Sequence, residues 1–399
     1  MFVFIFAGCV LLLIAWLAAD LHFGRKQRLE KAGYDRMPMR KGAIQMFTRG
    51  SELFKDYFAE LRRAERHIHV LFYIVKEDAL NQEFFGILRE KAQAGVEVRL
   101  LVDWIGSMAL TKETAASLRQ AGIHLAFSHK IKLPFPFYSS QARNHRKITV
   151  LDGVIGYLGG YNVGNEYIGG NPKLSPWRDY HLKITGESVQ DLQQIFLTDW
   201  KEAFSEDLRQ LPCYFCKSES GSAEHMLLPT SGFMLEEICL ELLKNAKQKV
   251  FIGSPYFIPS RKLFAELIAC LERGVELTIL VPGIADHPLV KEASYRYLRV
   301  LIKNGARVYQ YMYGFYHAKT ILIDDTVCDI GSANFDKRSL FLNSEINCFI
   351  FGKKEIAQAA AIIEHDINAS RELTLAELER PDPARTAKEI AARAVSLFL

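Results

Sequence analysis

The sequence predicts an α/β protein built from two similar halves that follow one membrane-spanning helix. The first observation is a stretch that occurs twice, as NHRKITVLDGVIGYLGGYN at 144–162 and as YHAKTILIDDTVCDIGSAN at 316–334. The second is that KAQAGVEVRLLVD, from Lys91, matches CLERGVELTILVP, from Cys270, within a common order of helical and strand patterns. The third is an almost entirely apolar segment at 1–19. Because strands alternate with helices in both halves, each half is expected to be an α/β sandwich.

Helices and strands follow one another in the same order in both halves. In the first half, apolar spacing through Leu53, Phe58 and Leu61 predicts a helix over 51–66. Strands are then expected at 67–75, 96–102 and 123–127, with helices at 81–94 and 111–120. The second half repeats this order with helices at 232–246, 262–272 and 289–303 and strands at 249–253, 275–281 and 307–310.

Composition shifts predict the domain boundaries. We expect a transmembrane anchor over 1–20, a basic linker over 21–47, a first half over 48–205, a connector over 206–226, a second half over 227–375 and a C-terminal amphipathic helix over 376–399. The C-terminal helix either packs on the core or lies on a bilayer, and packing is the commoner case.

The apolar segment at 1–19 is about as long as a helix that spans a bilayer. No Lys or Arg precedes it, whereas Arg25, Lys26, Arg28 and Lys31 follow it. The positive-inside rule therefore places the amino terminus outside and the rest of the chain in the cytoplasm. A cleaved signal peptide is the alternative, but its positive charge would precede the apolar run.

Composition narrows the class of protein. The 399 residues carry a formal net charge of +4, too small to indicate nucleic-acid binding by itself. The seven cysteines are scattered, which favours a reducing compartment. Cys213 and Cys216 form a lone C-x-x-C, and without a second pair it is weak evidence for zinc, so no metal or other cofactor is predicted.

The repeated stretch carries side chains suited to phosphoryl transfer. His145 and His317 each stand two residues before a lysine, Lys147 and Lys319, and so share a face of an extended strand with it. One histidine can attack phosphorus, and a second can protonate the leaving alkoxide. The two lysines, with Asn162 and Asn334, supply donors for the phosphate oxygens. Because each copy supplies half of this set, the two copies are expected to face each other.

These stretches resemble the paired HKD motifs of the phospholipase D superfamily, and the chain after its N-terminal segment resembles the bacterial cardiolipin synthases. Gly159-Gly160 in the first copy and Gly331-Ser332 in the second also follow the superfamily pattern. The resemblance implies two phospholipase-D-like α/β sandwich halves related by pseudo-two-fold symmetry, with the motifs meeting at their interface. It implies transfer of a phosphatidyl group from one phosphatidylglycerol to a second, giving cardiolipin and glycerol without a cofactor.

The resemblance also implies roles for individual residues. His145 is the expected nucleophile and His317 the expected acid and base. Asp179 and Glu345, on the strand after each motif, are expected to orient a motif histidine. The remaining members of the predicted site are the motif residues Asp152 and Asp324, which we expect to brace the motif loops, with Gly160, Ser332 and Glu166 in the surrounding shell.

Three features favour a lipid substrate over nucleic acid. The anchor holds the chain on a membrane, and no long basic stripe with interleaved aromatic residues is visible. The apolar loop PFPFY at 134–138 precedes the first motif, so Phe135 and Phe137 are expected either to contact the membrane or to pack in the core. The expected partners are phosphatidylglycerol, anionic lipids and the bilayer. The alternatives are a hydrolytic phospholipase D, a phosphatidylserine synthase, a membrane-bound nuclease or a lipid-binding protein without catalysis.

Overall fold

The computed structural model describes residues 2–31, 37–216 and 220–396. One sheet of sixteen strands runs through these residues, and its strand order has a two-fold pattern. From edge to centre, the first half contributes β4 (His124–Ser128), β3 (Glu97–Asp103), β2 (His67–Phe72), β5 (Ile148–Leu151), β6 (Ile155–Gly159), β7 (Trp177–Gly186) and β1 (Arg40–Arg49). The second half contributes β11 (Arg307–Tyr311), β10 (Glu276–Pro282), β9 (Lys249–Gly253), β13 (Thr320–Ile323), β14 (Val327–Gly331), β15 (Ser344–Ile350) and β8 (Ala223–Ser231).

Two short strands complete the sheet: β16 (Ser370–Glu372) lies beside β11, and β12 (Phe315–Tyr316) pairs with β7 across the halves.

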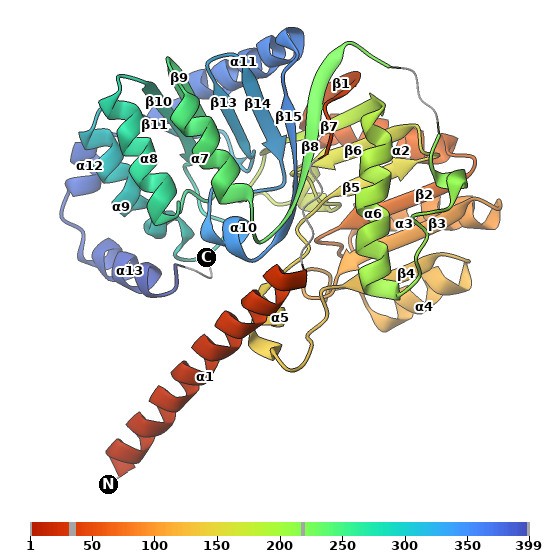
Figure 1. Cartoon of the computed structure of the whole chain (residues 1–399), viewed down its shortest axis with the longest axis horizontal. Helices are drawn as coiled ribbons and strands as arrows, with labels where there is room; N and C mark the ends of the chain where they lie inside the picture. The colour runs from red at the N-terminus through yellow and green to blue at the C-terminus, as the bar shows by residue number, and fades with distance from the viewer. Residues whose placement is uncertain (1, 32–36, 217–219, 397–399) are drawn as a thin grey trace.

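The helices of the two halves also correspond in pairs. In the first half they are α2 (Gly50–Arg63), α3 (Ala79–Gln93), α4 (Lys112–Gln120) and α6 (Ser188–Phe204). In the second half they are α7 (Leu235–Asn245), α8 (Arg261–Glu272), α9 (Val290–Lys303) and α11 (Lys353–Asn368). The predicted α/β fold of two halves is confirmed, and Figure 1 shows the halves side by side.

The strands read as continuous apolar runs because both faces of the sheet are covered. Val70 belongs to a core shared with α2 and α3, whereas its neighbour Leu71 belongs to a second core on the other face. This second core contains Phe196 of α6 and Ile363 of α11, so it crosses from one half to the other. The outer face of the second half has its own core. The shared core fixes the two halves against each other.

The halves join through β1 and β8, which pair antiparallel at the centre of the sheet. Gly42 lies at this join, and a Cβ there would stand 2.3 Å from the main-chain oxygen of Thr185. The predicted linker over 21–47 and connector over 206–226 are therefore wrong where they include these two strands. Exposed residues recur along β1, and Glu224, His225 and Pro229 interrupt β8, so neither sequence shows the continuous apolar run of a buried strand.

The N-terminal helix α1 (Phe2–Lys31) projects from the globular part, as Figure 1 shows. It is long and apolar enough to cross a membrane, and its apolar part is almost entirely exposed. The predicted linker is wrong here as well, because the helix continues through the basic residues and docks on the domain. Asp20 accepts a hydrogen bond from the main-chain N–H of Tyr138, and Arg25 donates to the main-chain oxygen of Phe341.

The C-terminal segment forms two helices, α12 (Leu375–Glu379) and α13 (Pro383–Ala394), and not the single helix expected. Pro381 and Pro383 interrupt the chain between them. The helix α13 packs on α9, where Glu389 accepts two hydrogen bonds from Arg299 at 2.7 and 2.5 Å. Parts of the predicted linker, connector and C-terminal helix, at 32–36, 217–219 and 397–399, lie outside the described residues.

Candidate active site

Both motif histidines lie where the halves meet. The main-chain N–H of His145 donates to the oxygen of Ser344 at 2.9 Å, and that of His317 donates to the oxygen of Arg178 at 2.7 Å. Ser344 begins β15 and Arg178 lies in β7, so each motif is held by the strand that follows the other motif. The two copies therefore meet, as their complementary chemistry predicted.

Each histidine is paired with a carboxylate from the opposite half. The Nδ1 atom of His145 lies 2.9 Å from Oε2 of Glu345, and Nδ1 of His317 lies 2.5 Å from Oδ2 of Asp179. A carboxylate can only accept, so Nδ1 of each ring donates to it and each Nε2 remains for chemistry. The Nζ atom of Lys319 also lies 2.6 Å from Nδ1 of His317. Neither half holds a complete histidine–carboxylate pair by itself.

The two motif lysines are buried beside the histidines. The Nζ atom of Lys147 donates to the main-chain oxygen of His145 at 2.6 Å, and Lys319 donates to that of His317. Burial lowers the pKa of Lys147 to about 7 and the pKa of Lys319 to about 8, and the positive charge of Lys319 adds to the shift of Lys147. An anion bound between them would relieve both shifts, which is what a phosphate site requires.

The carboxylates of Glu345 and Asp179 differ in how many hydrogen bonds compensate for their burial. Glu345 accepts hydrogen bonds from Ser332 at 2.6 Å and from Ser339 at 2.8 Å, as well as from His145. Burial raises its pKa, but the contact with His145 and these hydrogen bonds outweigh burial, and the pKa of Glu345 is lowered overall. For Asp179 burial dominates and raises the pKa to about 6, although Lys319 opposes the shift.

The same contrast appears in the histidines. Burial lowers the pKa of His145, and the charge of Glu345 opposes this shift. Burial, reinforced by the charge of Lys319, lowers the pKa of His317 well below its ordinary value. In the empty site both rings are therefore neutral near pH 7.

The Gly-Gly and Gly-Ser dipeptides match these two carboxylates. A Cβ at Gly160 would stand 2.1 Å from Oδ1 of Asp179, so a side chain at this position would displace the carboxylate. Its counterpart Ser332 instead donates from its hydroxyl to Glu345. The small residue leaves room for Asp179, and the serine supplies a hydrogen bond to Glu345.

The motif aspartates lie outside this site, so their inclusion in the catalytic set is corrected. Asp152 follows β5 whereas His145 precedes it, a separation of seven residues or roughly 20 Å along an extended chain. The carboxylate of Asp152 accepts the main-chain N–H groups of 65–67, and that of Asp324 accepts those of 247–249. Asp152 therefore braces the turn before β2, and Asp324 braces the turn before β9.

Other residues predicted to surround the motif histidines are Asn162, Glu166 and Asn334, and the first two make their contacts elsewhere. The side-chain amide of Asn162 accepts from the main chain of Ile74 and donates to the hydroxyl of Tyr167, which leaves it poorly placed to bind phosphate. Glu166 pairs with Lys76 at 2.8 Å and with neither motif histidine. Asn334 is buried, and its side-chain oxygen has no partner among the described residues.

Aromatic side chains that the motif did not reveal flank the histidines. The ring of Tyr73 lies 4.9 Å from that of His145, and the ring of Trp177 lies 4.9 Å from that of His317. Tyr256 is 6.3 Å from His317, and the two tyrosines follow corresponding strands, Tyr73 after β2 and Tyr256 after β9. This equivalent placement in the repeated halves could have revealed the two tyrosines from the sequence. Within the described residues, no group of three or more His, Cys, Asp and Glu side chains forms a metal site.

The loop expected to contact the membrane lies beside α1. Phe135 and Phe137 are half-buried, and Phe135 packs against a small cluster with Tyr138 and Leu21 of α1. Just before them in the chain, Ile131 is 45% exposed and Leu133 is 85% exposed. The loop therefore combines half-buried aromatic residues with exposed aliphatic ones.

Comparison with known proteins identifies relatives over nearly the whole chain. The family described as "Cardiolipin synthase, PLD-like domain" matches residues 57–200 and 239–367. "Minor cardiolipin synthase ClsB" of Bacillus subtilis is 38% identical over 390 residues, covering 98% of both chains. "Major cardiolipin synthase ClsA" of the same organism is 37% identical over 347 residues, covering 85% of this chain and 72% of the relative.

Among solved structures, phosphatidylserine synthase of Haemophilus influenzae superposes with a TM-score of 0.73 and 18% identity, covering 94% of this chain and 99% of that one. Polyphosphate kinase of Porphyromonas gingivalis superposes with a TM-score of 0.57 and 15% identity, covering 88% and 53%. At these identities the likeness concerns the fold alone.

Proposed function

The chain belongs to the PLD-like cardiolipin synthases and is a phosphatidyltransferase, and we propose that it moves a phosphatidyl group from one phosphatidylglycerol to the primary hydroxyl of a second. The products are cardiolipin and glycerol. The observation that carries this proposal is the cross-paired site, in which two histidines with free Nε2 atoms lie beside two buried lysines.

In the first step, Nε2 of His145 attacks phosphorus, a P–N bond forms, and the P–O bond to the departing glycerol breaks. The carboxylate of Glu345, held ionised by its hydrogen bonds, accepts from Nδ1 and stabilises the positive charge that develops on the ring. The ammonium groups of Lys147 and Lys319 stabilise the charge on the phosphate oxygens.

Burial and Lys319 hold the pKa of His317 low in the empty site, and the negative phosphodiester opposes that shift when it binds, so that Nε2 takes up a proton. His317 then gives this Nε2 proton to the glycerol oxygen. In the second step, the now neutral His317 takes a proton from the hydroxyl of the second phosphatidylglycerol. The resulting alkoxide attacks phosphorus, the P–N bond breaks and His145 is regenerated.

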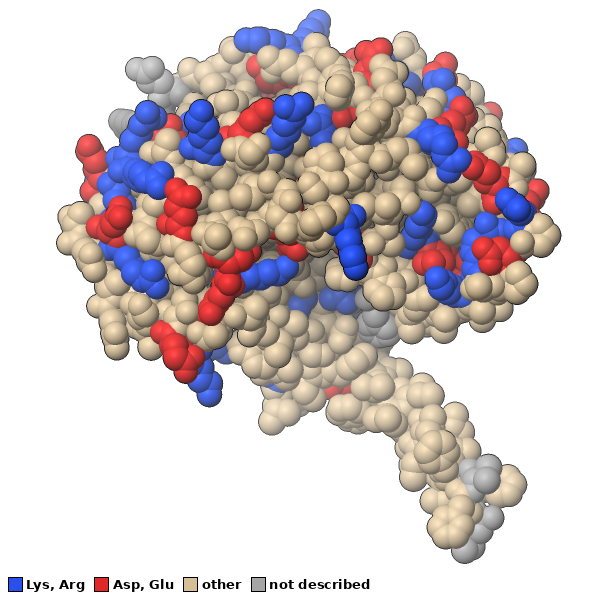
Figure 2. All heavy atoms as spheres, turned by 180° about the vertical axis from the view of Figure 1, so that it is seen from behind, with Lys and Arg blue, Asp and Glu red and all other residues tan. Residues whose placement is uncertain are grey.

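The surroundings favour a lipid alcohol over water as the acceptor. The helix α1 tethers the chain to a bilayer, where phosphatidylglycerol is concentrated. In Figure 2, α1 is nearly free of charged residues, whereas charges of both signs are mixed over the visible face of the globular part. Charges mixed in this way do not form the basic stripe that a nucleic-acid strand requires.

The deciding experiment is product analysis with the full chain on phosphatidylglycerol vesicles containing serine as a competing acceptor. Cardiolipin and glycerol should appear in equal amounts and exceed every other product. Mostly phosphatidic acid would mean a hydrolase, and mostly phosphatidylserine would mean a serine transferase. Absence of turnover with intact lipid binding would mean a binding protein.

We further propose that the catalytic domain faces the cytoplasm, on the side of the basic residues at the end of α1. A protease added outside intact cells should leave the domain whole, as seen by immunoblotting of a C-terminal tag. Opening the cells before adding the protease is the control. Digestion of the domain in intact cells would reverse the orientation.

A further inference from the structure

A cavity of about 700 Å³ lies behind the catalytic chain, where α1, α6 and the loop before α5 (Pro136–Gln141) meet. Asn144, Arg146 and Ser344 line it. Their neighbours His145 and Glu345 do not line it but form the catalytic pair. Since successive side chains of an extended chain point to opposite faces, the cavity and the catalytic site lie on opposite sides of the same segment.

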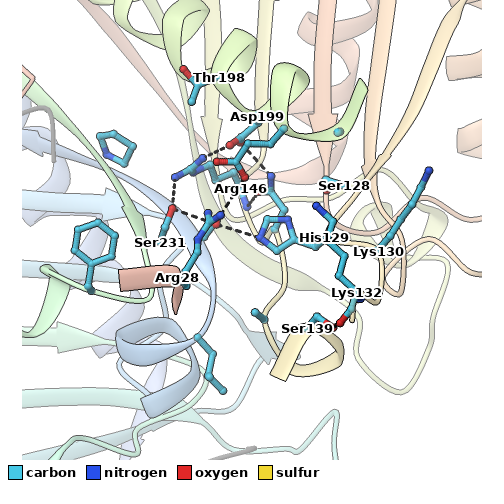
Figure 3. A pocket seen from close by; sticks show the side chains of 18 of the residues that line it. Arg28, Ser128, His129, Lys130, Lys132, Ser139, Arg146, Thr198, Asp199 and Ser231 are labelled. Carbon is cyan, nitrogen blue, oxygen red and sulfur yellow. Dashed lines mark hydrogen bonds and ion pairs between the residues drawn. The ribbon is translucent and has the colours of Figure 1, made fainter. Parts of the chain in front are cut away.

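The wall next to the catalytic segment is polar and ordered. Arg146 donates to Ser231 at 3.2 Å, the hydroxyls of Ser231 and Ser344 are 3.3 Å apart, and Ser344 lies 3.4 Å from Nε2 of His129 (Figure 3). Arg146 and Ser344 are both nearly completely buried. This is a built polar surface that faces a space large enough for a ligand.

The charges around the cavity do not cancel. Asp199 pairs with Arg146 at 2.5 Å and Glu202 pairs with Arg28 at 3.1 Å, so the two carboxylates that line the cavity are already neutralised. Lys132 has no ion-pair partner among the described residues. Figure 3 shows its side chain reaching toward His129, whereas Lys130, which also lines the cavity, points away from the group. An unpaired ammonium group therefore remains for an anion.

The opposite wall is apolar and continues onto the membrane helix. Phe135, Phe233 and Leu342 line this side together with Leu133, which is 85% exposed. Gly24 of α1 also lines the cavity, and its neighbour Phe23 is 53% exposed on the apolar part of the helix. Acyl chains leaving the cavity would run along α1 into the bilayer, a path that a free anion does not need.

We propose that this cavity binds the phosphate headgroup of an anionic membrane phospholipid at a site separate from the catalytic histidines, with Lys132 as its charge contact. The polar wall and the unpaired lysine suit the phosphate, and the apolar wall beside α1 suits the acyl chains. Because the site is defined by binding, it stands or falls independently of the proposed transfer reaction.

The test measures lipid binding to the full chain in detergent by native mass spectrometry. The probes are phosphatidic acid, phosphatidylcholine with the same acyl chains, and inorganic phosphate. The wild type should bind two molecules of phosphatidic acid, and Lys132→Gln should weaken one of these events about tenfold, the scale of a lost charge-assisted hydrogen bond. The matched control Lys130→Gln should change neither event by more than about twofold.

A second variant removes space instead of charge. Thr198→Phe, on α6, should block the same binding event while leaving the other intact, and the melting temperature of each variant shows whether it is folded. Transfer on a short-chain soluble phosphatidylglycerol should be unchanged in Lys132→Gln. A loss there would place the cavity within the substrate site and overturn the proposal.

Three other results of the binding experiment would overturn the proposed lipid site. Equal effects of the two lysine substitutions, or none from either, would remove Lys132 from the site. Equal binding of phosphatidylcholine would remove the selection for an anion. Binding of inorganic phosphate at comparable affinity, with loss in the same variant, would mean a site for a free anion and not for a lipid.

Discussion

The two halves place a histidine, a lysine and a carboxylate at equivalent positions, yet the two sites have different electrostatics. The carboxylate that serves His145 accepts hydrogen bonds from two serines, and its pKa is lowered. The carboxylate that serves His317 lies against Gly160, and burial raises its pKa to about 6. Gene duplication explains the shared backbone, and the differences around it supply two roles from one motif.

The largest expected effect comes from removing each motif histidine in turn. His145→Ala should abolish both the covalent adduct and the cardiolipin product, because it removes the nucleophile. His317→Ala removes only the proton donor and should lower kcat about 10²–10⁴-fold. Phosphatidyl-enzyme trapped in acid and turnover on phosphatidylglycerol vesicles measure the two losses.

A substrate whose leaving group needs no protonation sharpens this comparison. It should restore the first step in His317→Ala, so that adduct accumulates, and it should not restore His145→Ala. Adduct found on His317 would exchange the two assignments. Inversion at phosphorus with no adduct in any variant would contradict the double displacement.

The dipeptides beside the carboxylates should respond unequally to the same small change. Gly160→Ala places a methyl group 2.1 Å from Oδ1 of Asp179 in the unrelaxed structure, so the carboxylate must move and His317 with it. We expect a loss of about 10²-fold in kcat, the usual effect of misplacing a catalytic group by about 1 Å. Ser332→Ala removes one of several hydrogen bonds to Glu345 and should cost about tenfold or less.

The substrate whose leaving group needs no protonation also distinguishes these two variants. Formation of the adduct by Gly160→Ala should recover on the substrate that needs no proton, whereas that by Ser332→Ala should not, because the former acts through His317 and the latter through His145. Urea unfolding of both variants controls for stability. Equal losses with no recovery would indicate a general structural effect and would remove the distinction.

The pH dependence should report the same asymmetry with a smaller effect. Below about pH 6, Asp179 becomes protonated and no longer supports His317. As the pH rises through about 7 to 8, Lys147 and then Lys319 lose their charges and bind phosphate less well. The value of kcat/KM, which reports the free enzyme, should therefore peak between about pH 6 and 7 and fall by at most about tenfold per unit for each proton.

Replacing Lys147 by an arginine, whose charge does not titrate in this range, tests which group causes the fall of kcat/KM at high pH. Lys147→Arg should extend activity to higher pH, even if its peak value falls because the guanidinium fits less well. The full pH profile of kcat/KM is the measurement. An alkaline limb that is the same in the wild type and in Lys147→Arg would show that another group controls it.

Sequence alone predicted the two halves and the facing motifs because both follow from repeated residues. It also indicated Asp179 and Glu345 because they align on the strand that follows each motif, after a longer loop in the first half. It could not show that Glu345 contacts His145 and that Asp179 contacts His317, since this exchange depends on how Ser344 and Arg178 pair with the opposite motif. The central strands β1 and β8 were missed because exposed or polar residues interrupt both, so neither shows a continuous apolar run.

The smallest expected effect concerns two neighbours in the loop before α5, one exposed and one packed. Leu133 is 85% exposed, whereas Phe135 packs against the cluster of Tyr138, Ala142 and Leu342, on which Leu21 of α1 also packs. If Leu133 enters the bilayer, Leu133→Asp should raise the apparent KM on vesicles about tenfold, given that burying a leucine contributes roughly 1.5–3 kcal/mol. It should leave turnover of a short-chain soluble lipid and the urea midpoint unchanged. Phe135→Asp should instead lower the urea midpoint and reduce activity on both substrates, because it disrupts the contact with α1. Unchanged vesicle kinetics in Leu133→Asp would show that this loop does not reach the membrane, and α1 would then be the sole attachment among the described residues.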